Sequence, residues 1–269
     1  MRRLRKWAYY AYSVFELLTG VRNWPTVLRI FLGKEDGRVR WLKLRRCGVE
    51  MGVRSRMDAW SVKETFLDQF YTKHRMQIEA NWVVVDIGAA IGEFTVYAAK
   101  AAPHGRVFAF EPYGESYTLM VENLRRNGVK NVTAEQVAIW HEAGELALDL
   151  SLGEPLQAPS LESEITAHSH NKIRAITLAD FFKTSGVAQV DLLKLDCEGA
   201  EFPILLNLPT DLWERIQRIV LEYHDGYQGY QHGVLAELLL DQGYQVWVEP
   251  NWVHEEIGYL YAIKPGKSS

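Results

Sequence analysis

The sequence predicts a Rossmann-like α/β fold with a seven-stranded, mostly parallel sheet and helices on both faces. From residue 82 onward, short apolar runs of strand length alternate with helix-like segments. A glycine-containing turn follows the first of these runs, and a carboxylate, Glu111, ends the second. The last two strand-like runs are separated by a short loop, which indicates an antiparallel hairpin at the C-terminus.

Each strand of this sheet is predicted from a compact apolar run, as expected for strands buried on both faces. The runs lie at 82–86, 106–111, 132–138, 190–196, 218–222, 244–249 and 258–263. Helices are expected between them, ending at Lys100, spanning 115–126 and 178–184, beginning near Ala200, and spanning 233–242. Glycines 128, 186 and 243 follow three of the helices as stop signals.

The segment before this sheet has a different character. Residues 1–57 are predicted to form an N-terminal extension and residues 58–269 the Rossmann-like domain. Within the extension, 1–32 predicts one or two helices broken near Gly20 and Pro25, and 38–42 is strand-like. At the start of the main domain we expect a helix over 58–73. Further along, the polar stretch 151–172 contains two prolines and is interpreted as a loop or insertion.

Charge is unevenly distributed over the 269 residues. Residues 1–56 hold 14 Lys and Arg against 4 Asp and Glu, whereas the remainder holds 16 against 30. The acidic remainder argues against nucleic acid as the main partner. The basic, aromatic extension is interpreted as a lid over an acceptor site, or alternatively as a contact with an anionic membrane surface.

Two further features bear on location. Apolar runs do not reach the roughly 18 residues that a membrane-spanning helix needs. The two cysteines, Cys47 and Cys197, are read as reduced thiols. The expected location is therefore cytoplasmic, with attachment to the inner face of a membrane as the variant that the extension suggests. The sequence carries no signal for the oligomeric state.

The turn after the first strand predicts a nucleoside site. Gly88 permits a tight turn and close approach of a ligand, and Gly92 lets the next helix pack near the strand. Asp86 suits loop anchoring or a hydrogen bond to the ligand, and Glu111 suits ribose hydroxyls. Ala90 occupies a position where a pyrophosphate needs glycine. This disfavours a dinucleotide and a nicotinamide-dependent oxidoreductase, but it is compatible with S-adenosylmethionine, which has no phosphates.

A second group of polar residues follows two later strands. Strand alternation puts Lys194 and Asp196 on one face, and likewise Glu222 and His224. Because strand ends meet at one edge, these side chains are predicted to converge on a cleft. Capping of the next helix is the plainer explanation for Asp196 and Glu198.

Taken together, the motifs resemble those of the FkbM family of methyltransferases over about residues 55–225. The matching pieces are Asp86-Ile87-Gly88-Ala89 with Gly92, Phe110-Glu111-Pro112, Glu122-Asn123-Leu124, Ile176 to Phe181, Asp191 to Glu201, and Val220 to His224. The most specific of them is the Lys-x-Asp-x-Glu-Gly-x-Glu pattern that begins at Lys194. Ala90 and Ala179 depart from the family pattern, which often has Asn and Asp there.

The resemblance implies a class I methyltransferase that transfers a methyl group from S-adenosylmethionine to a hydroxyl of a small molecule, namely a sugar, a glycan or a natural product. It implies a cofactor site made by Asp86, Gly88, Ala89, Ala90, Gly92, Glu111, Pro112, Tyr113, Val137, Ala138 and Asp196. The implied catalytic residues are Lys194, Asp196, Glu222 and His224. Glu198, Trp60 and Tyr71 are expected to contact the acceptor.

The chemistry of these residues leaves several roles open. Asp196 or His224 is the candidate base, and Lys194 suits orientation of the acceptor or stabilisation of an alkoxide. Alternatively, Asp196, Glu222 and His224 would hold Mg²⁺ or Mn²⁺. The competing functions are an NAD-type oxidoreductase, and a cofactor-binding or membrane-associated interaction protein without turnover. A nucleobase N-methyltransferase is disfavoured because 196–199 lacks the Pro-Pro-aromatic stretch common in those enzymes.

Overall fold

The computed structural model describes residues 2–33, 36–45, 47–147, 172–251, 253–254 and 256–265. The helices are α1 (Arg2–Gly20), α2 (Trp24–Leu32), α3 (Arg56–Lys63), α4 (Glu93–Ala101), α5 (Gly114–Arg126), α6 (Leu178–Ser185), α7 (Glu201–Leu206), α8 (Thr210–Trp213) and α9 (His232–Asp241), with short π or 3-10 turns η1 (Glu64–Asp68), η2 (Phe70–Thr72) and η3 (Tyr227–Gly229). The strands are β1 (Arg40–Lys43), β2 (Glu50–Val53), β3 (Val83–Ile87), β4 (Arg106–Phe110), β5 (Val132–Glu135), β6 (Ala138–Ile139), β7 (Gly144–Ala147), β8 (Lys172–Ile176), β9 (Leu192–Leu195), β10 (Arg218–His224), β11 (Gln245–Pro250) and β12 (Ile257–Ile263).

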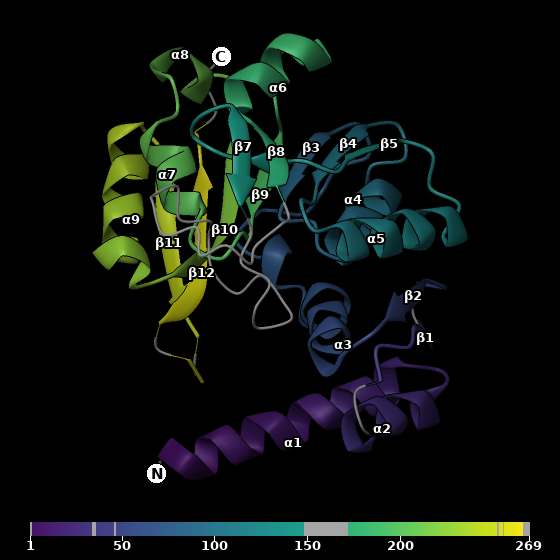
Figure 1. Ribbon diagram of the computed structural model, residues 1–269. Helices are drawn as coiled ribbons and strands as arrows, with labels where there is room; N and C mark the ends of the chain where they lie inside the picture. Colours follow the sequence, from purple (N-terminus) through teal and green to yellow (C-terminus); the bar gives the residue numbers. More distant parts are fainter. Residues whose placement is uncertain are drawn as a thin grey trace.

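The main sheet has seven strands in the order β11-β12-β10-β9-β3-β4-β5. Neighbours from β10 to β5 pair in parallel, whereas β12 pairs antiparallel with both β10 and β11. The predicted sheet and C-terminal hairpin are therefore confirmed (Figure 1). From β3 the chain moves first to β4 and β5, then returns to the other side of β3 to form β9. The strand order thus reverses beside β3, and open α/β sheets bind their ligands at such a point.

Alternating side chains divide the core between the two faces of the sheet. Val85 and Ile87 of β3 pack with α6, α7, α8 and α9. Val84, on the opposite face, packs with α4 and with Tyr71. Asp86 shares that second face. In the cross-strand register it lies directly opposite Lys194 of β9. The second face therefore carries the charged pair Asp86 and Lys194.

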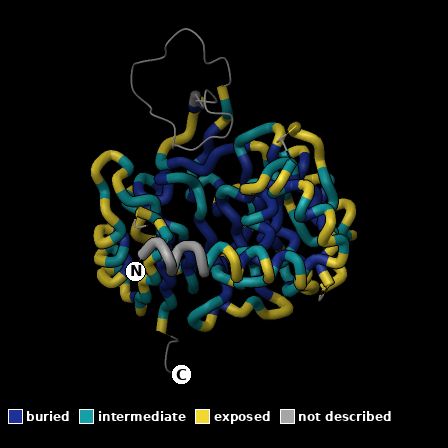
Figure 2. Tube along the Cα trace, turned by 90° about the horizontal axis from the view of Figure 1, so that it is seen from below, coloured by how far each residue is buried: buried dark blue, intermediate teal, exposed yellow. Residues whose placement is uncertain are grey.

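The N-terminal segment packs on the same molecular body. Its buried side chains, which include Leu17, Val27 and Met51, belong to one apolar cluster with Leu119 and Met120 of α5. Buried and exposed residues separate into an interior and a rim in Figure 2. Among the described residues, no helix is both long enough and apolar enough to cross a bilayer.

Two predicted elements differ from the structure. The helix expected over 58–73 ends at Lys63, continues as η1, and is broken at Gln69, whose φ of 55° is left-handed. The strand expected over 132–138 is divided into β5 and β6, and β6 belongs to a separate three-stranded sheet with β8 and β7. Sequence periodicity could not show either change, because tertiary packing decides both. Most of the loop predicted at 151–172 lies outside the described residues.

Candidate active site

The turn after β3 is the first part of the candidate site. Gly88 has a φ of +71°, and a Cβ added there would lie 1.9 Å from the carbonyl oxygen of Asp196. Gly92 has a φ of +81°, and its Cβ would lie 2.6 Å from Cγ of Met120. Ala90 also adopts a left-handed conformation, with a φ of 46°. Glycine at 88 and 92 therefore allows the turn to lie against both β9 and α5.

Glu111, at the end of β4, lies directly against this turn. Its carboxylate accepts hydrogen bonds from the backbone N–H of Ala90 (2.8 Å) and of Tyr113 (2.8 Å). The side chain is buried, and burial raises the pKa of Glu111 to about 7 despite these two hydrogen bonds. The structure thus brings together the glycine turn and the acid that were predicted to form one site.

Lys194 and Asp86 form a buried charged pair beneath the turn. The Lys194 ammonium lies 3.1 Å from the Asp86 carboxylate and donates a 2.8 Å hydrogen bond to the carbonyl of Gly88. Asp86 also accepts a 2.6 Å hydrogen bond from the hydroxyl of Thr95. Burial opposes the charge of Lys194, but the surrounding carboxylates raise its pKa above the usual value. Lys194 is 1% exposed, so its contacts tie β9 to the turn.

Glu93, in the first turn of α4, was not predicted as a site residue. It is 4% exposed, and its Oε2 has no hydrogen-bond partner among the described residues. Burial raises the pKa of Glu93 to about 8. A buried carboxylate oxygen without a donor is costly unless a ligand supplies one. The position of Glu93 directly after Gly92 was the sequence signal that could have identified it.

Asp196 is a carboxylate of the site that reaches solvent. Its side chain is 26% exposed, and it accepts a 2.7 Å hydrogen bond from the Tyr71 hydroxyl. The same hydroxyl lies 3.4 Å from Oε2 of Glu222 on β10. Burial, followed by the charge of Asp196, raises the pKa of Glu222 well above its usual range. Asp196, Tyr71 and Glu222 therefore meet as predicted, although they come from three distant parts of the chain.

Glu64, in the π-helical turn η1, is a second acid that sequence reasoning missed. Its carboxylate accepts a 3.0 Å hydrogen bond from the indole N–H of Trp60. Burial and then the charge of Asp196 raise the pKa of Glu64 to about 8, which places it within electrostatic reach of Asp196. Single π turns occur often at functional sites. In the sequence, Glu64 is indistinguishable from an acid on the exposed face of a helix.

His224 is held by acids on two sides. Its Nδ1 lies 3.1 Å from Glu201, which also accepts from the backbone N–H of Gly199, and its Nε2 lies 3.4 Å from Glu198. Burial alone would lower the pKa of His224, but the hydrogen bond and charge of Glu201 raise it to about 10. The imidazole is then cationic at neutral pH, which disfavours its predicted role as a base.

The remaining predicted cofactor residues lie around Glu111. Pro112 and Tyr113 connect β4 to α5, and Ala89 donates its N–H to the carbonyl of Phe110. Buried Val137 and Ala138 lie where β5 gives way to β6. Their roles in binding remain predictions.

A family model, the methyltransferase FkbM domain, matches residues 86–246, which include the turn, Glu111, Asp196 and His224. The chain belongs to the FkbM methyltransferase family. Its sheet order and C-terminal hairpin are those of class I S-adenosylmethionine-dependent methyltransferases, and the fold predicted from the sequence is confirmed.

This FkbM-family chain resembles three curated proteins. It is 29% identical to the 31-O-demethyl-FK506 methyltransferase FkbM of Streptomyces tacrolimicus over 61% of this chain and 73% of that one. It is 27% identical to Methyltransferase 1 of Beauveria bassiana, over 72% and 84%. The match to the AMB antimetabolite synthetase AmbE of Pseudomonas aeruginosa, at 26% identity, covers 76% of this chain but 11% of AmbE.

Among solved structures, the methyltransferase FkbM of Methylobacillus flagellatus KT superposes with a TM-score of 0.51 at 16% identity. The superposition covers 72% of this chain and 47% of the other chain, and it supports the fold.

The site residues fit S-adenosylmethionine. The Lys194 ammonium lies among the carboxyl groups of Asp86, Asp196 and Glu93. The Glu93 oxygen that has no hydrogen-bond partner among the described residues suits a cationic donor such as the cofactor's amino group. The metal alternative gains no such support. Within the described residues, no group of three or more His, Cys, Asp or Glu side chains is arranged to hold a metal ion.

Proposed function

We propose that this chain transfers the methyl group of S-adenosylmethionine to a hydroxyl oxygen of a small-molecule acceptor, such as a sugar, a glycan or a natural product. The observation that carries the proposal is the contact between Gly88 and Asp196, which sets a partly exposed carboxylate against the cofactor turn. An alcohol needs a nearby base to become a good nucleophile. Bound S-adenosylmethionine would supply an electrophilic methyl group on a sulfonium.

Asp196 is the proposed base. Tyr71 donates a hydrogen bond to one of its oxygens, which holds the carboxylate in place, and its partial exposure allows an acceptor to reach it. The raised pKa of Glu222 favours the protonated carboxyl, so that group is suited to donating a hydrogen bond to the acceptor. Lys194 is proposed to position the turn and Asp196, rather than to contact the acceptor.

The name of the Streptomyces relative supports the choice of oxygen. That protein is a methyltransferase of 31-O-demethyl-FK506, a compound whose name indicates a free oxygen at the methylated position. The raised pKa of His224 favours its cationic form, which disfavours His224 as the base and supports Asp196.

The direct test is to incubate the full chain with methyl-labelled S-adenosylmethionine and a panel of sugars, glycosides and macrolactones. Mass spectrometry then locates the transferred methyl group. We expect an O-methyl product that Asp196→Asn reduces by about 10²- to 10⁴-fold, while the affinity for S-adenosylhomocysteine changes little. A product methylated on nitrogen or carbon, or tight binding of NAD in place of S-adenosylhomocysteine, would contradict the proposal.

A further inference from the structure

We propose that the outer surface of α1 and α2 docks onto an anionic lipid membrane. We call this surface the α1–α2 face and define it by Tyr12, Phe15, Trp24, Arg29 and Leu32. Both helices lie along the lower edge of the molecule in Figure 1, outside the sheet. The proposal concerns where the protein works, and it is independent of the reaction at Asp196.

The α1–α2 face is unusually apolar for an exposed surface. Of ten large hydrophobic side chains that are exposed among the described residues, four lie on α1 and α2. Tyr12 and Phe15 are 60% and 61% exposed and, three residues apart, share one side of α1. Leu32 is 82% exposed, and Trp24, two helical turns earlier on α2, is 45% exposed. Large apolar side chains exposed on two helices that pack on each other are a feature of interaction surfaces.

The opposite side of α1 is already occupied by the rest of the protein. Leu17 and Ser13 are buried, and the rings of Tyr9 and Tyr10 lie 6.0 and 5.8 Å from the Trp60 ring. Lys63, buried beneath α1, lies 3.1 Å from Glu16. Since this side anchors the helix, the exposed aromatic side is not needed for folding and is available to a partner.

Charge identifies the partner. Residues 1–56 carry ten more basic than acidic side chains, and Arg22, Arg29 and Arg45 are exposed. Apolar side chains combined with cations are the pattern of proteins that lie in the interface of anionic bilayers. The rest of the chain, with 16 Lys and Arg against 30 Asp and Glu, would be repelled by the same surface. This asymmetry would orient the molecule with the α1–α2 face toward lipid.

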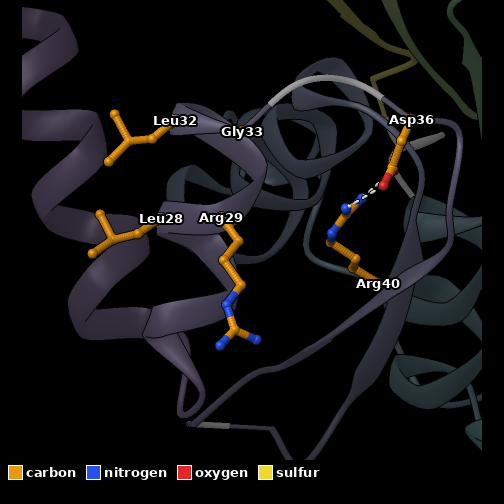
Figure 3. A pocket seen from close by; sticks show the side chains of 6 residues that line it. All are labelled: Leu28, Arg29, Leu32, Gly33, Asp36 and Arg40. Carbon is orange, nitrogen blue, oxygen red and sulfur yellow. Dashed lines mark hydrogen bonds and ion pairs between the residues drawn. The ribbon is translucent and has the colours of Figure 1, made fainter.

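A hollow of about 570 Å³ beside α2 adds a place for a lipid headgroup (Figure 3). Its lining combines Leu28 and Leu32 with Arg29, and it is completed by Gly33, Asp36 and Arg40. Arg40 is paired with Asp36 at 2.8 Å, whereas Arg29 has no ion pair with a described residue. Among the lining residues that the structure describes, Arg29 is thus a cation available to a lipid phosphate, with the two leucines beside it for the acyl region.

The test is flotation of the full chain with vesicles of phosphatidylcholine alone or with 30% phosphatidylglycerol. We expect binding to the anionic vesicles that weakens in high salt. The variant Tyr12→Ser, Phe15→Ser, Leu32→Ser should bind at least about tenfold more weakly. Arg29→Glu should lower binding by about fivefold or more. The matched control is Val121→Ser, Leu240→Ser, Val248→Ser, which removes exposed apolar side chains elsewhere and should bind like the parent.

Two results would overturn the proposal. One is equal flotation of the parent and the triple variant, or no flotation of the parent, with both proteins shown to be folded by their thermal transitions. The other is a dimer in light scattering that the triple variant dissociates while neither protein binds vesicles, which would assign the α1–α2 face to a second copy of the chain.

Discussion

Glu111 is the residue on which cofactor binding is expected to depend most. Its carboxylate fixes the turn through Ala90, and the ribose hydroxyls are predicted to bind this carboxylate. Hydrogen bonds to charged groups contribute roughly 1.5–3 kcal/mol. Glu111→Ala should therefore weaken S-adenosylhomocysteine binding by about 10- to 100-fold in calorimetry. Glu142→Ala, at an exposed acid elsewhere, is the control. Unchanged affinity in Glu111→Ala would remove this residue from the site.

The buried acids also predict a pH dependence of binding. Glu111 and Glu93 have pKa values raised to about 7 and about 8. As the pH falls, they therefore bind protons at a higher pH than ordinary carboxyl groups do. A cationic ligand favours their ionised forms, and binding at pH 6 to 7 should release protons. Affinity for S-adenosylmethionine should increase as the pH rises from 6 to 8.5. Calorimetry in two buffers of different ionisation enthalpy measures the proton release, and proton uptake would contradict the account.

The charge of His224 should be measurable from the pH dependence of the free energy of unfolding. A group whose pKa is raised in the folded state stabilises it below the unfolded pKa of 6.5, and this contribution is lost as the pH rises through the folded value of about 10. The difference in unfolding free energy between the parent and His224→Gln should thus be largest below pH 6.5 and shrink toward pH 10. Denaturant titrations at pH 6, 8 and 10 measure it, and a difference that grows with pH would show a neutral imidazole.

At the scale of elements, the close approach of the β3 turn to β9 makes Gly88 irreplaceable. Gly88→Ala would put a methyl group 1.9 Å from a backbone oxygen, and the backbone has to move. We expect loss of S-adenosylhomocysteine binding and a lower melting temperature. Gly128→Ala is a matched control, because Gly128 also has a positive φ (+64°) but faces open space. That control should lose about 1 kcal/mol of stability and keep its affinity. Equal effects would show that strain alone is responsible.

Lys63 links α1 to η1 through two ion pairs. This lysine is 1% exposed and lies between Glu16 and Asp68, at 3.1 and 2.6 Å. Lys63→Met would leave two acids without their cation, and breaking a buried ion pair typically costs about 3–5 kcal/mol. Lys172→Met, in an exposed pair with Glu145, should cost less than about 1 kcal/mol. Chemical denaturation measures the free energy of unfolding of both variants. Similar decreases would show that the ion pairs of Lys63 contribute little to stability.

The sequence predicted those elements whose signals are local. Apolar runs and glycine stops located the seven strands and most helices, and the motif at 86–92 predicted the turn that the structure places against Glu111. The π turn at Glu64 and the separate strand β6 were missed because packing against distant segments decides them. The state of His224 was also hidden, since its partners Glu198 and Glu201 come together with it only in the folded chain.

At the scale of the whole molecule, the order of the strands in the sheet brings the site residues together. Residues as distant as Tyr71, Asp86, Asp196 and Glu222 meet because the order reverses beside β3 and η2 packs on the same face of the sheet. The N-terminal segment belongs to this arrangement, since its apolar cluster is continuous with that of α5. One side of α1 thereby supports Trp60 near the site, while the other side is exposed.

The most direct test of the central claim is a crystal structure of the full chain with S-adenosylhomocysteine. Our expectation is the adenosine in the turn at 86–92, the ribose hydroxyls against Glu111, and the sulfur directed toward Asp196. An adenosine bound elsewhere, or a sulfur directed away from Asp196, would contradict it.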